Sequence, residues 1–257
     1  MPTADQHQAT GLVKLMYIGD SGTGKTGSMV SLLAEGYKFK ILDMDAGLGY
    51  FINEAKRQGL HDRLKDVEFE TYRDTYVTTP SGLMVKGTPK AATSALAKMQ
   101  EWSAIDDPMT VFALDSLSAY GKASFEWARH MNPMAKDPRQ WYHAAQQMVE
   151  ATIANVTNPA FAMNVLVVTH VNYKEVTEGV HKGYANAIGT ALGPIIPRYF
   201  DTMILAESSG AGKTTRRKIK TLPTGIIDLK ISLPEVEAEL PLESGLATIF
   251  QKLKGTN

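Results

Sequence analysis

Gly19-Asp20-Ser21-Gly22-Thr23-Gly24-Lys25-Thr26 is the stretch that decides the fold of this 257-residue chain. It has the complete pattern G-x-x-x-x-G-K-[ST] of a phosphate-binding loop. The apolar residues 12–18 before it predict a buried strand, and residues 28–35 after it predict a helix. Glycines in such a loop let backbone N–H groups surround a phosphate, and the helix N-terminus adds partial positive charge. A glycine-rich turn that matches by chance is the alternative, and the strand and helix on either side argue against it.

The residue types of the loop indicate a nucleoside triphosphate bound together with a metal ion. The Lys25 ammonium can reach the β- and γ-phosphates, and the Thr26 hydroxyl can ligate Mg²⁺. We therefore predict ATP and Mg²⁺ as ligands. The residues expected to bind the nucleotide are Gly19, Asp20, Ser21, Gly22, Thr23, Gly24, Lys25, Thr26 and Gly27.

The overall composition gives no sign of nucleic-acid binding, because 27 Lys and Arg residues balance 27 Asp and Glu residues. Any such binding therefore needs local basic patches. The chain contains no cysteine, which excludes disulfides, thiolate metal sites and cysteine catalysis and fits a reducing cytosol. Residues 1–10 are polar and do not predict a secretory signal, and no apolar run is long enough to predict a membrane span. We expect a cytoplasmic protein with no membrane partner.

Short apolar runs that alternate with helical stretches predict the fold class. The runs expected to be strands buried on both faces are residues 39–42, 111–114, 165–168 and 203–206. Residues 89–103 and 138–156 predict helices between them. The class expected is α/β, with a mostly parallel central sheet flanked by helices. In open sheets of this kind, ligands collect at the carboxyl ends of the strands.

Two further regions have their own patterns. Residues 67–86 predict an inserted strand or hairpin with a turn at Pro80-Ser81-Gly82. From Arg216 onward the chain predicts further strands and then a short helix at 246–253. We expect residues 1–257 to form one domain, with a core at about 11–230 and a short C-terminal extension at 231–257.

Two acidic motifs follow predicted strands. Asp115 ends the run V-F-A-L-D-S, where it can hold Mg²⁺ through water beside Thr26; capping the next helix is the alternative. Asp43 and Asp45 lie two apart in I-L-D-M-D-A-G, so on a strand they would project to the same face. One of them can polarise the water that attacks the γ-phosphate, and a turn or capping role is the alternative.

These motifs, in this order, resemble those of the RecA-like recombinase P-loop ATPases, in particular reduced phage-encoded members associated with single-strand annealing. The phosphate loop matches fully, and L-D-S-L-S-A-Y at 114–120 resembles the family's V-D-S-x-A-A-L. I-L-D-M-D-A-G-L at 41–48 resembles F-I-D-A-E-H-A-L, which gives Asp45 the position of the glutamate that activates water. Aspartate is one methylene shorter, so we expect hydrolysis to be slower or differently arranged. The resemblance covers residues 11–230.

The resemblance extends to two further catalytic candidates. The run V-L-V-V-T-H ends at His170, where the family has a glutamine that senses the γ-phosphate and relays to a DNA-binding loop. A neutral imidazole can donate one hydrogen bond to a phosphate, and a histidine satisfied at a strand end is the alternative. Lys218 and Lys220 share a strand face and match a K-x-K pair that the family contributes to the neighbouring subunit's γ-phosphate. The alternative is a solvated basic edge strand.

A second glycine-rich stretch, S-S-G-A-G-K-T at 208–214, is a decoy. Glu207 replaces the first glycine of the motif, and the basic residues 216–220 follow where a helix would be needed. This stretch predicts a hairpin turn.

The resemblance also implies two DNA-binding loops, at 129–139 and 172–190. Trp127 and Trp141 flank the first loop, and basic groups beside aromatic rings suit a single strand. Glycines and polar residues in the second loop predict mobility. Two ordinary surface loops are the alternative. The DNA-binding candidates are Arg129, Lys136, Arg139, Lys174, Lys182 and Tyr184, with Tyr173 beside them.

The function that the resemblance implies is ATP hydrolysis, stimulated by single-stranded DNA, in phage recombination or replication by annealing or strand pairing. It implies a homo-oligomer, a possible single-strand-binding protein partner and, for a phage protein, the host cytoplasm. Because the chain starts about ten residues before its first strand, we expect no N-terminal polymerisation module, and a ring becomes an alternative to a filament. A helicase, helicase loader or packaging motor remains the alternative function. A ParA-like switch is disfavoured by Asp20 and Ser21, and no acceptor-site signature indicates a metabolic kinase.

Overall fold

The computed structural model describes residues 11–80, 82–233 and 235–255. Its main strands are β1 (Lys14–Gly19), β2 (Lys38–Asp43), β3 (Val67–Thr71), β6 (Thr110–Asp115), β7 (Asn164–Thr169), β10 (Thr202–Ser209), β11 (Arg216–Lys220) and β12 (Glu239–Pro241). The α-helices are α1 (Lys25–Ser28), α2 (Val30–Ala34), α3 (Leu48–Arg57), α4 (Ala91–Trp102), α5 (Leu117–Met131), α6 (Arg139–Thr157) and α7 (Leu242–Lys254). The 3₁₀ turns within these ranges are η2 (His61–Asp66), η3 (Ile196–Tyr199) and η4 (Gly212–Thr214).

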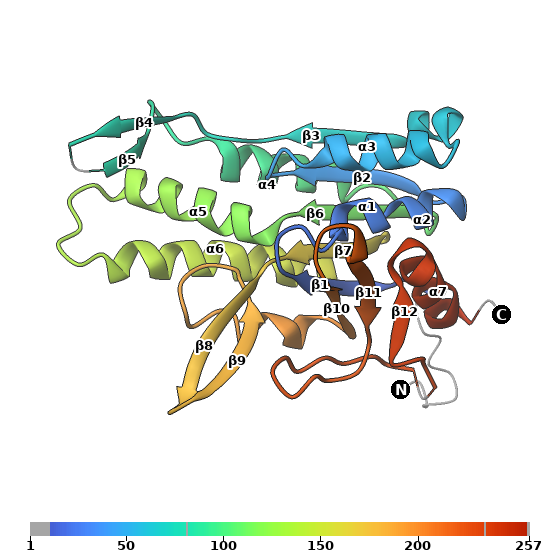
Figure 1. Ribbon diagram of the computed structural model, residues 1–257. Coiled ribbons are helices and arrows are strands. Elements are labelled where there is room, and N and C mark those ends of the chain that lie inside the picture. Colours follow the sequence, from blue (N-terminus) through green and yellow to red (C-terminus); the bar gives the residue numbers. More distant parts are fainter. Residues whose placement is uncertain (1–10, 81, 234, 256–257) are drawn as a thin grey trace, which may run out of the picture.

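Within the described ranges these strands form one eight-stranded sheet in the order β12-β11-β10-β1-β7-β6-β2-β3 (Figure 1). Every pairing from β10 to β3 is parallel, and β11 and β12 are added antiparallel at one edge. The four apolar runs predicted as strands lie in β2, β6, β7 and β10. The predicted α/β class with a mostly parallel sheet flanked by helices is therefore confirmed.

Helices cover both faces of the sheet, and β1 contributes to both cores. Leu15 and Tyr17 are buried in the cluster that contains side chains of α2, α3 and α7. Met16 and Ile18 are buried in the cluster that contains side chains of α4, α5 and α6. Because successive side chains of a strand point to opposite faces, a strand covered on both sides needs a continuous apolar run.

Helix boundaries differ from the sequence prediction at two glycines. The helix after the phosphate loop begins at Lys25 rather than residue 28 and is divided at Met29 into α1 and α2. The C-terminal helix begins at Leu242 rather than 246. Gly27 and Gly245 lower the intrinsic helix propensity of these first turns. Close packing requires a glycine at position 245, since a Cβ there would lie 2.8 Å from the Leu240 Cβ.

Two small hairpins stand outside the main sheet. Residues 67–86 supply both the edge strand β3 and the hairpin of β4 (Tyr76–Thr79) with β5 (Gly82–Val85). The predicted turn falls between these strands, and its Ser81 lies outside the described residues, as do residues 1–10. The second hairpin pairs β8 (Val171–Thr177) with β9 (Val180–Ala185). In Figure 1 both hairpins and the α5–α6 turn extend to the same side of the molecule, away from α7.

A buried lysine joins the amino end of β1 to the end of α6. The Lys14 Nζ donates hydrogen bonds to the carbonyl oxygens of Val156 (3.3 Å), Phe161 (2.6 Å) and Met163 (2.9 Å). These bonds satisfy carbonyls that neither helix nor strand pairing uses. Burial lowers the pKa of Lys14 from 10.5 to about 8, and the Asp201 charge opposes this shift.

We predict that Lys14→Met lowers the free energy of unfolding by about 1–3 kcal/mol, because it removes the Lys14 donor from the carbonyl oxygens of Val156 and Met163. Between pH 8 and 10.5 the unfolded lysine holds a proton that the folded lysine has lost, so its contribution to stability rises with pH. Denaturant unfolding at pH 7.5 and pH 10 should therefore show a larger difference in the free energy of unfolding between wild type and variant at pH 10. A gap that narrows at pH 10 would contradict the lowered pKa.

Candidate functional site

The phosphate loop lies at the carboxyl end of β1, between that strand and α1. Gly19 approaches β10 so closely that a Cβ would lie 2.6 Å from the carbonyl oxygen of Ala206. Gly24 caps α1 with a φ of 92°, a conformation that glycine adopts without strain. The Lys25 Nζ donates hydrogen bonds to the carbonyl oxygens of Gly19 (2.7 Å) and Asp20 (2.8 Å). The loop thus has the strand–turn–helix context that its sequence predicts.

Thr26 and Asp115 meet beside the loop. The Thr26 hydroxyl donates a 2.6 Å hydrogen bond to the Asp115 carboxylate, although the two residues lie 89 positions apart. Burial raises the pKa of Asp115 to about 6, the Thr26 hydrogen bond opposes the shift, and the charges of Asp45 and Asp43 add to it. Two adjacent oxygens in an acidic, buried setting suit Mg²⁺, which takes few protein ligands and completes its shell with water and phosphate.

Asp43 and Asp45 do not share a face, contrary to the strand-based expectation. β2 ends at Asp43, whose carboxylate accepts hydrogen bonds from the backbone N–H groups of Gly47 (2.9 Å) and Leu48 (3.3 Å) at the start of α3. Asp45 lies in the following turn and accepts a 2.5 Å hydrogen bond from the Ser116 hydroxyl. The turn, in which Ala46 has a φ of 56°, separates the capping carboxylate from the one that faces the phosphate loop.

His170 follows β7 directly and faces the same site. Its ring Nδ1 lies 3.2 Å from the Ser118 hydroxyl, which also accepts a 3.1 Å hydrogen bond from the His170 backbone N–H. Burial and the Lys25 charge lower the pKa of His170, while Asp45 and Asp20 oppose this shift. The imidazole is therefore neutral at pH 7 and can donate a single hydrogen bond.

These elements enclose a cavity of about 290 Å³ above the carboxyl ends of the strands. It is lined by Ser21, Gly22, Gly24, Lys25, Thr26, Asp45, Gly47, Tyr50, Asp115, His170 and Arg217. Sequence reasoning missed Gly47, Tyr50 and Arg217. Tyr50 lies in α3 against Gly27, where a Cβ would come within 2.2 Å of its ring. The two-residue period of β11 would have indicated Arg217, since it must face away from Lys218.

Lys218 and Lys220 do not line this cavity. Lys218 forms ion pairs with Glu239 (2.5 Å) and Glu207 (3.5 Å), and Lys220 pairs with Glu207 at 3.0 Å. A role at a neighbouring subunit's phosphate would require these ion pairs to open. The decoy stretch before them forms the turn between β10 and β11, as predicted, and β11 rather than a helix follows it.

The first predicted DNA region lies at the α5–α6 turn. Arg129 belongs to α5 and pairs with Glu126 at 2.6 Å, and Arg139 pairs with Asp137 at 2.6 Å. Lys136 lies in the connection between the helices. Trp141 is partly structural, because its Nε1 donates a 2.8 Å hydrogen bond to the Asn132 carbonyl oxygen.

The second predicted region is the paired hairpin β8–β9 rather than an irregular loop. The Lys174 Nζ lies 5.3 Å from the centre of the Tyr184 ring and donates a hydrogen bond to the Thr190 carbonyl oxygen. Lys182 pairs with Asp228 at 2.9 Å. The Tyr173 hydroxyl donates a 3.2 Å hydrogen bond to the Asp20 carboxylate, which connects the hairpin to the phosphate loop.

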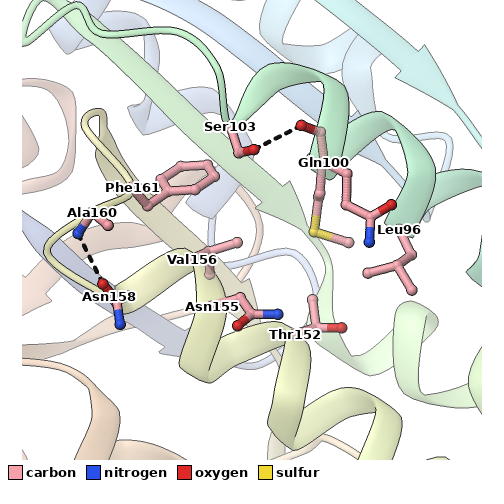
Figure 2. A pocket seen from close by; sticks show the side chains of 10 residues that line it. Leu96, Gln100, Ser103, Thr152, Asn155, Val156, Asn158, Ala160 and Phe161 are labelled. Carbon is pink, nitrogen blue, oxygen red and sulfur yellow. Dashed lines mark hydrogen bonds between the residues drawn. The ribbon is translucent and has the colours of Figure 1, made fainter.

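Another cavity, of about 370 Å³, lies between the last turns of α4 and α6 (Figure 2). These turns precede β6 and β7, so this cavity is at the opposite edge of the sheet from the phosphate loop. Its lining residues are uncharged, namely Leu96, Met99, Gln100, Ser103, Thr152, Asn155, Val156, Asn158, Ala160 and Phe161. It therefore offers no cation for a phosphate and no carboxylate for a metal.

Comparison with known proteins shows the family and a similar fold. A family model described as an AAA domain matches residues 12–231. No curated protein matches the sequence. A KaiC-like protein from the archaeon Pyrococcus horikoshii OT3 has a similar structure, at 11% identity and a TM-score of 0.50 over 92% of this chain and 88% of that one.

Two other structures are similar at lower TM-scores. The RadB recombinase gives 0.49 at 15% identity, over 91% of this chain and 89% of that one. The flagellar accessory protein FlaH from Methanocaldococcus jannaschii gives 0.47 at 10% identity, over 89% and 83%. Similarity at such identities concerns the fold alone.

We predict that Lys25→Ala abolishes tight nucleotide binding and that Asp45→Asn retains binding but loses at least a hundredfold in turnover, the usual scale for a general base. Asp43→Asn is the matched control, because its carboxylate caps α3 and should affect stability more than turnover. Nucleotide titration and steady-state ATP hydrolysis measure these effects. Normal hydrolysis by Asp45→Asn would show that another group orients the water.

Asp115→Asn should stabilise the ligand-free protein while abolishing Mg²⁺-dependent hydrolysis. A carboxyl whose folded pKa is raised to about 6 loses stability as pH rises towards 6 and keeps this penalty above it. At pH 7.5 we expect the melting temperature to rise by several degrees, at about 2–4 °C per kcal/mol. The gain should shrink at pH 5, where the wild-type carboxyl is also protonated. An equal gain at both pH values would contradict this account.

Proposed function

We propose that this chain, a P-loop ATPase that belongs to the AAA domain family, hydrolyses ATP in response to single-stranded DNA. The cofactor proposed is Mg²⁺, which Thr26 and Asp115 would hold beside the phosphates, where it would neutralise developing charge. Asp45 would orient the attacking water. The wider role proposed is annealing or strand pairing in phage recombination or replication, within the host cytoplasm.

One observation carries the proposed coupling to DNA: the β8–β9 hairpin is joined to the nucleotide site at two points. Its first residue, Val171, directly follows His170, which lines the phosphate cavity. Its Tyr173 hydroxyl is bonded to Asp20 of the phosphate loop. A triphosphate that contacts His170 or repels Asp20 would therefore shift the base of the hairpin. By reciprocity, a ligand on the hairpin would bias the nucleotide site.

The hairpin also carries groups that suit a single strand. Lys174 and Tyr184 place a cation beside an aromatic ring, and Lys182 lies in the same strand pair. Cations can contact phosphates while rings stack on bases without sequence preference. Lys136, Arg129 and Arg139 at the α5–α6 turn would extend this surface, since both segments project to the same side in Figure 1.

Assembly into a homo-oligomer, as a ring or a filament, is part of the proposal. Lys218 and Lys220 would leave Glu207 and Glu239 to meet the γ-phosphate of a neighbouring subunit. Exchange of one ion pair for another at a partly exposed site costs little, so such a contact could form on assembly. A single-strand-binding protein is a further proposed partner.

A motor or loader ATPase is the second candidate, and one surface favours it. Met131 and Met134 are 63% and 86% exposed at the α5–α6 turn, and Leu83 and Met84 are exposed on the adjacent β5. Between these segments lies a groove of about 600 Å³. Exposed methionines suit an adaptable protein interface, as a loader would need.

Among the described helices, none is both long and apolar enough to cross a bilayer.

The test is steady-state ATP hydrolysis across a titration of single-stranded DNA, with Lys25→Ala as the blank. We expect stimulation of about tenfold, which corresponds to about 1.4 kcal/mol of barrier. Lys174→Ala combined with Lys182→Ala should reduce this stimulation but not basal hydrolysis. Lys252→Ala, a lysine of α7 that pairs with Glu237, is the matched control. Hydrolysis that ignores DNA would reject the proposal and favour a protein-dependent motor or loader.

A further inference from the structure

Arg217 is the cation of β11 that faces the nucleotide cavity of its own subunit. Alternation along β11 divides its side chains between two faces. Ile219 is fully buried in the cluster that contains Leu242 and Leu246 of α7, and this fixes the face that it shares with Arg217. Lys218 lies on the other face with its acidic partners Glu207 and Glu239. Arg217 therefore lies at the cavity and Lys218 lies beside two carboxylates on the other face, although they are neighbours in sequence.

The stem of Arg217 lies directly over the phosphate loop. A Cβ on Gly24 would meet the Arg217 Cδ at 3.3 Å and the Leu242 Cδ2 at 2.5 Å. Gly24 is the N-cap of α1, and Arg217 lines the cavity beside it, so this side chain lies at the rim of the cavity next to the loop. Within the described part of the chain, no ion pair or hydrogen bond engages this guanidinium. An exposed cation at this place is available to an anionic ligand.

The order of the strands decides which part of the ligand Arg217 can reach. Asp115 ends β6, and Asp45 follows β2, on one side of β1. β11 lies on the other side, beyond β10. A metal ion held at Thr26 and Asp115 would lie on the acidic side, where it would neutralise charge on the terminal phosphates of the nucleotide. The opposite end of a bound triphosphate would then lie towards β11.

We propose that Arg217 binds the α- and β-phosphates of the nucleotide in cis and so sets affinity for ATP and ADP alike. It is a binding residue, distinct from the Lys218 and Lys220 pair, whose proposed contact is with the γ-phosphate of another subunit. The inference rests on nucleotide binding by the family and not on DNA. A guanidinium suits this task because its planar fork can donate two hydrogen bonds to phosphate oxygens.

The test compares Arg217→Gln with Arg216→Gln by calorimetric titration of Mg²⁺-ADP and of a non-hydrolysable Mg²⁺-ATP analogue, without DNA. Glutamine preserves much of the stem that packs over Gly24. We expect Arg217→Gln to weaken both ligands by tenfold or more and Arg216→Gln to leave both unchanged. In steady-state hydrolysis the same loss should appear as a raised KM for ATP.

Arg217→Lys keeps the charge and should recover part of the affinity, which distinguishes lost binding from a folding defect. Unchanged affinity in Arg217→Gln would overturn the proposal. Weakened binding of the triphosphate analogue alone would also overturn it, because that result would move Arg217 to the γ-phosphate. Neither result depends on whether DNA stimulates hydrolysis, so this proposal and the DNA-dependent function can fail separately.

Discussion

Parallel pairing of β1 with β7 and β10, and of β6 with β7 and β2, is the constraint on which the site depends. Parallel strands end at one edge, so the groups that follow them meet although they are far apart in sequence. The register pairs Asp43 with Asp115, and β7 separates their strands from β1, which ends in the phosphate loop at the same edge. The 2.6 Å contact between Thr26 and Asp115 is a consequence of this register.

Charge is distributed unevenly around the cavity, with carboxylates on one side and an arginine on the other, and this asymmetry would orient a bound polyphosphate. Asp45 and Asp115 stand on one side of the loop, with the Asp43 charge behind them, and their mutual repulsion and burial make the ligand-free state costly. Lys25 is turned onto its own loop carbonyls, and burial lowers its pKa. Arg217 lies on the other side. A bound metal ion and polyphosphate would relieve the acidic side and engage both cations, so ligand binding and stability are linked.

The hairpin β8–β9 provides a physical route between the nucleotide and a distant surface. It begins one residue after His170, and Tyr173 returns to the loop at Asp20. Ser118, at the start of α5, forms hydrogen bonds with both His170 and Thr169. The amino end of α5 therefore lies beside the residue that precedes the hairpin. The hairpin and α5 can therefore shift together when His170 changes its hydrogen bonds.

The sequence by itself determined the phosphate loop, the α/β class and the order of the strands along the chain, because local patterns of apolar residues and glycine encode them. It also predicted that Asp115 and His170 follow strands, since each ends an apolar run, and both line the cavity. It could not separate Asp43 from Asp45, because the turn at Ala46 depends on how α3 docks. Alternation along β11 separates Lys218 from Arg217, but the sequence could not say which of the two faces the cavity, because only the burial of Ile219 under α7 fixes that face. Tertiary packing decided these points since side-chain direction depends on what covers each strand.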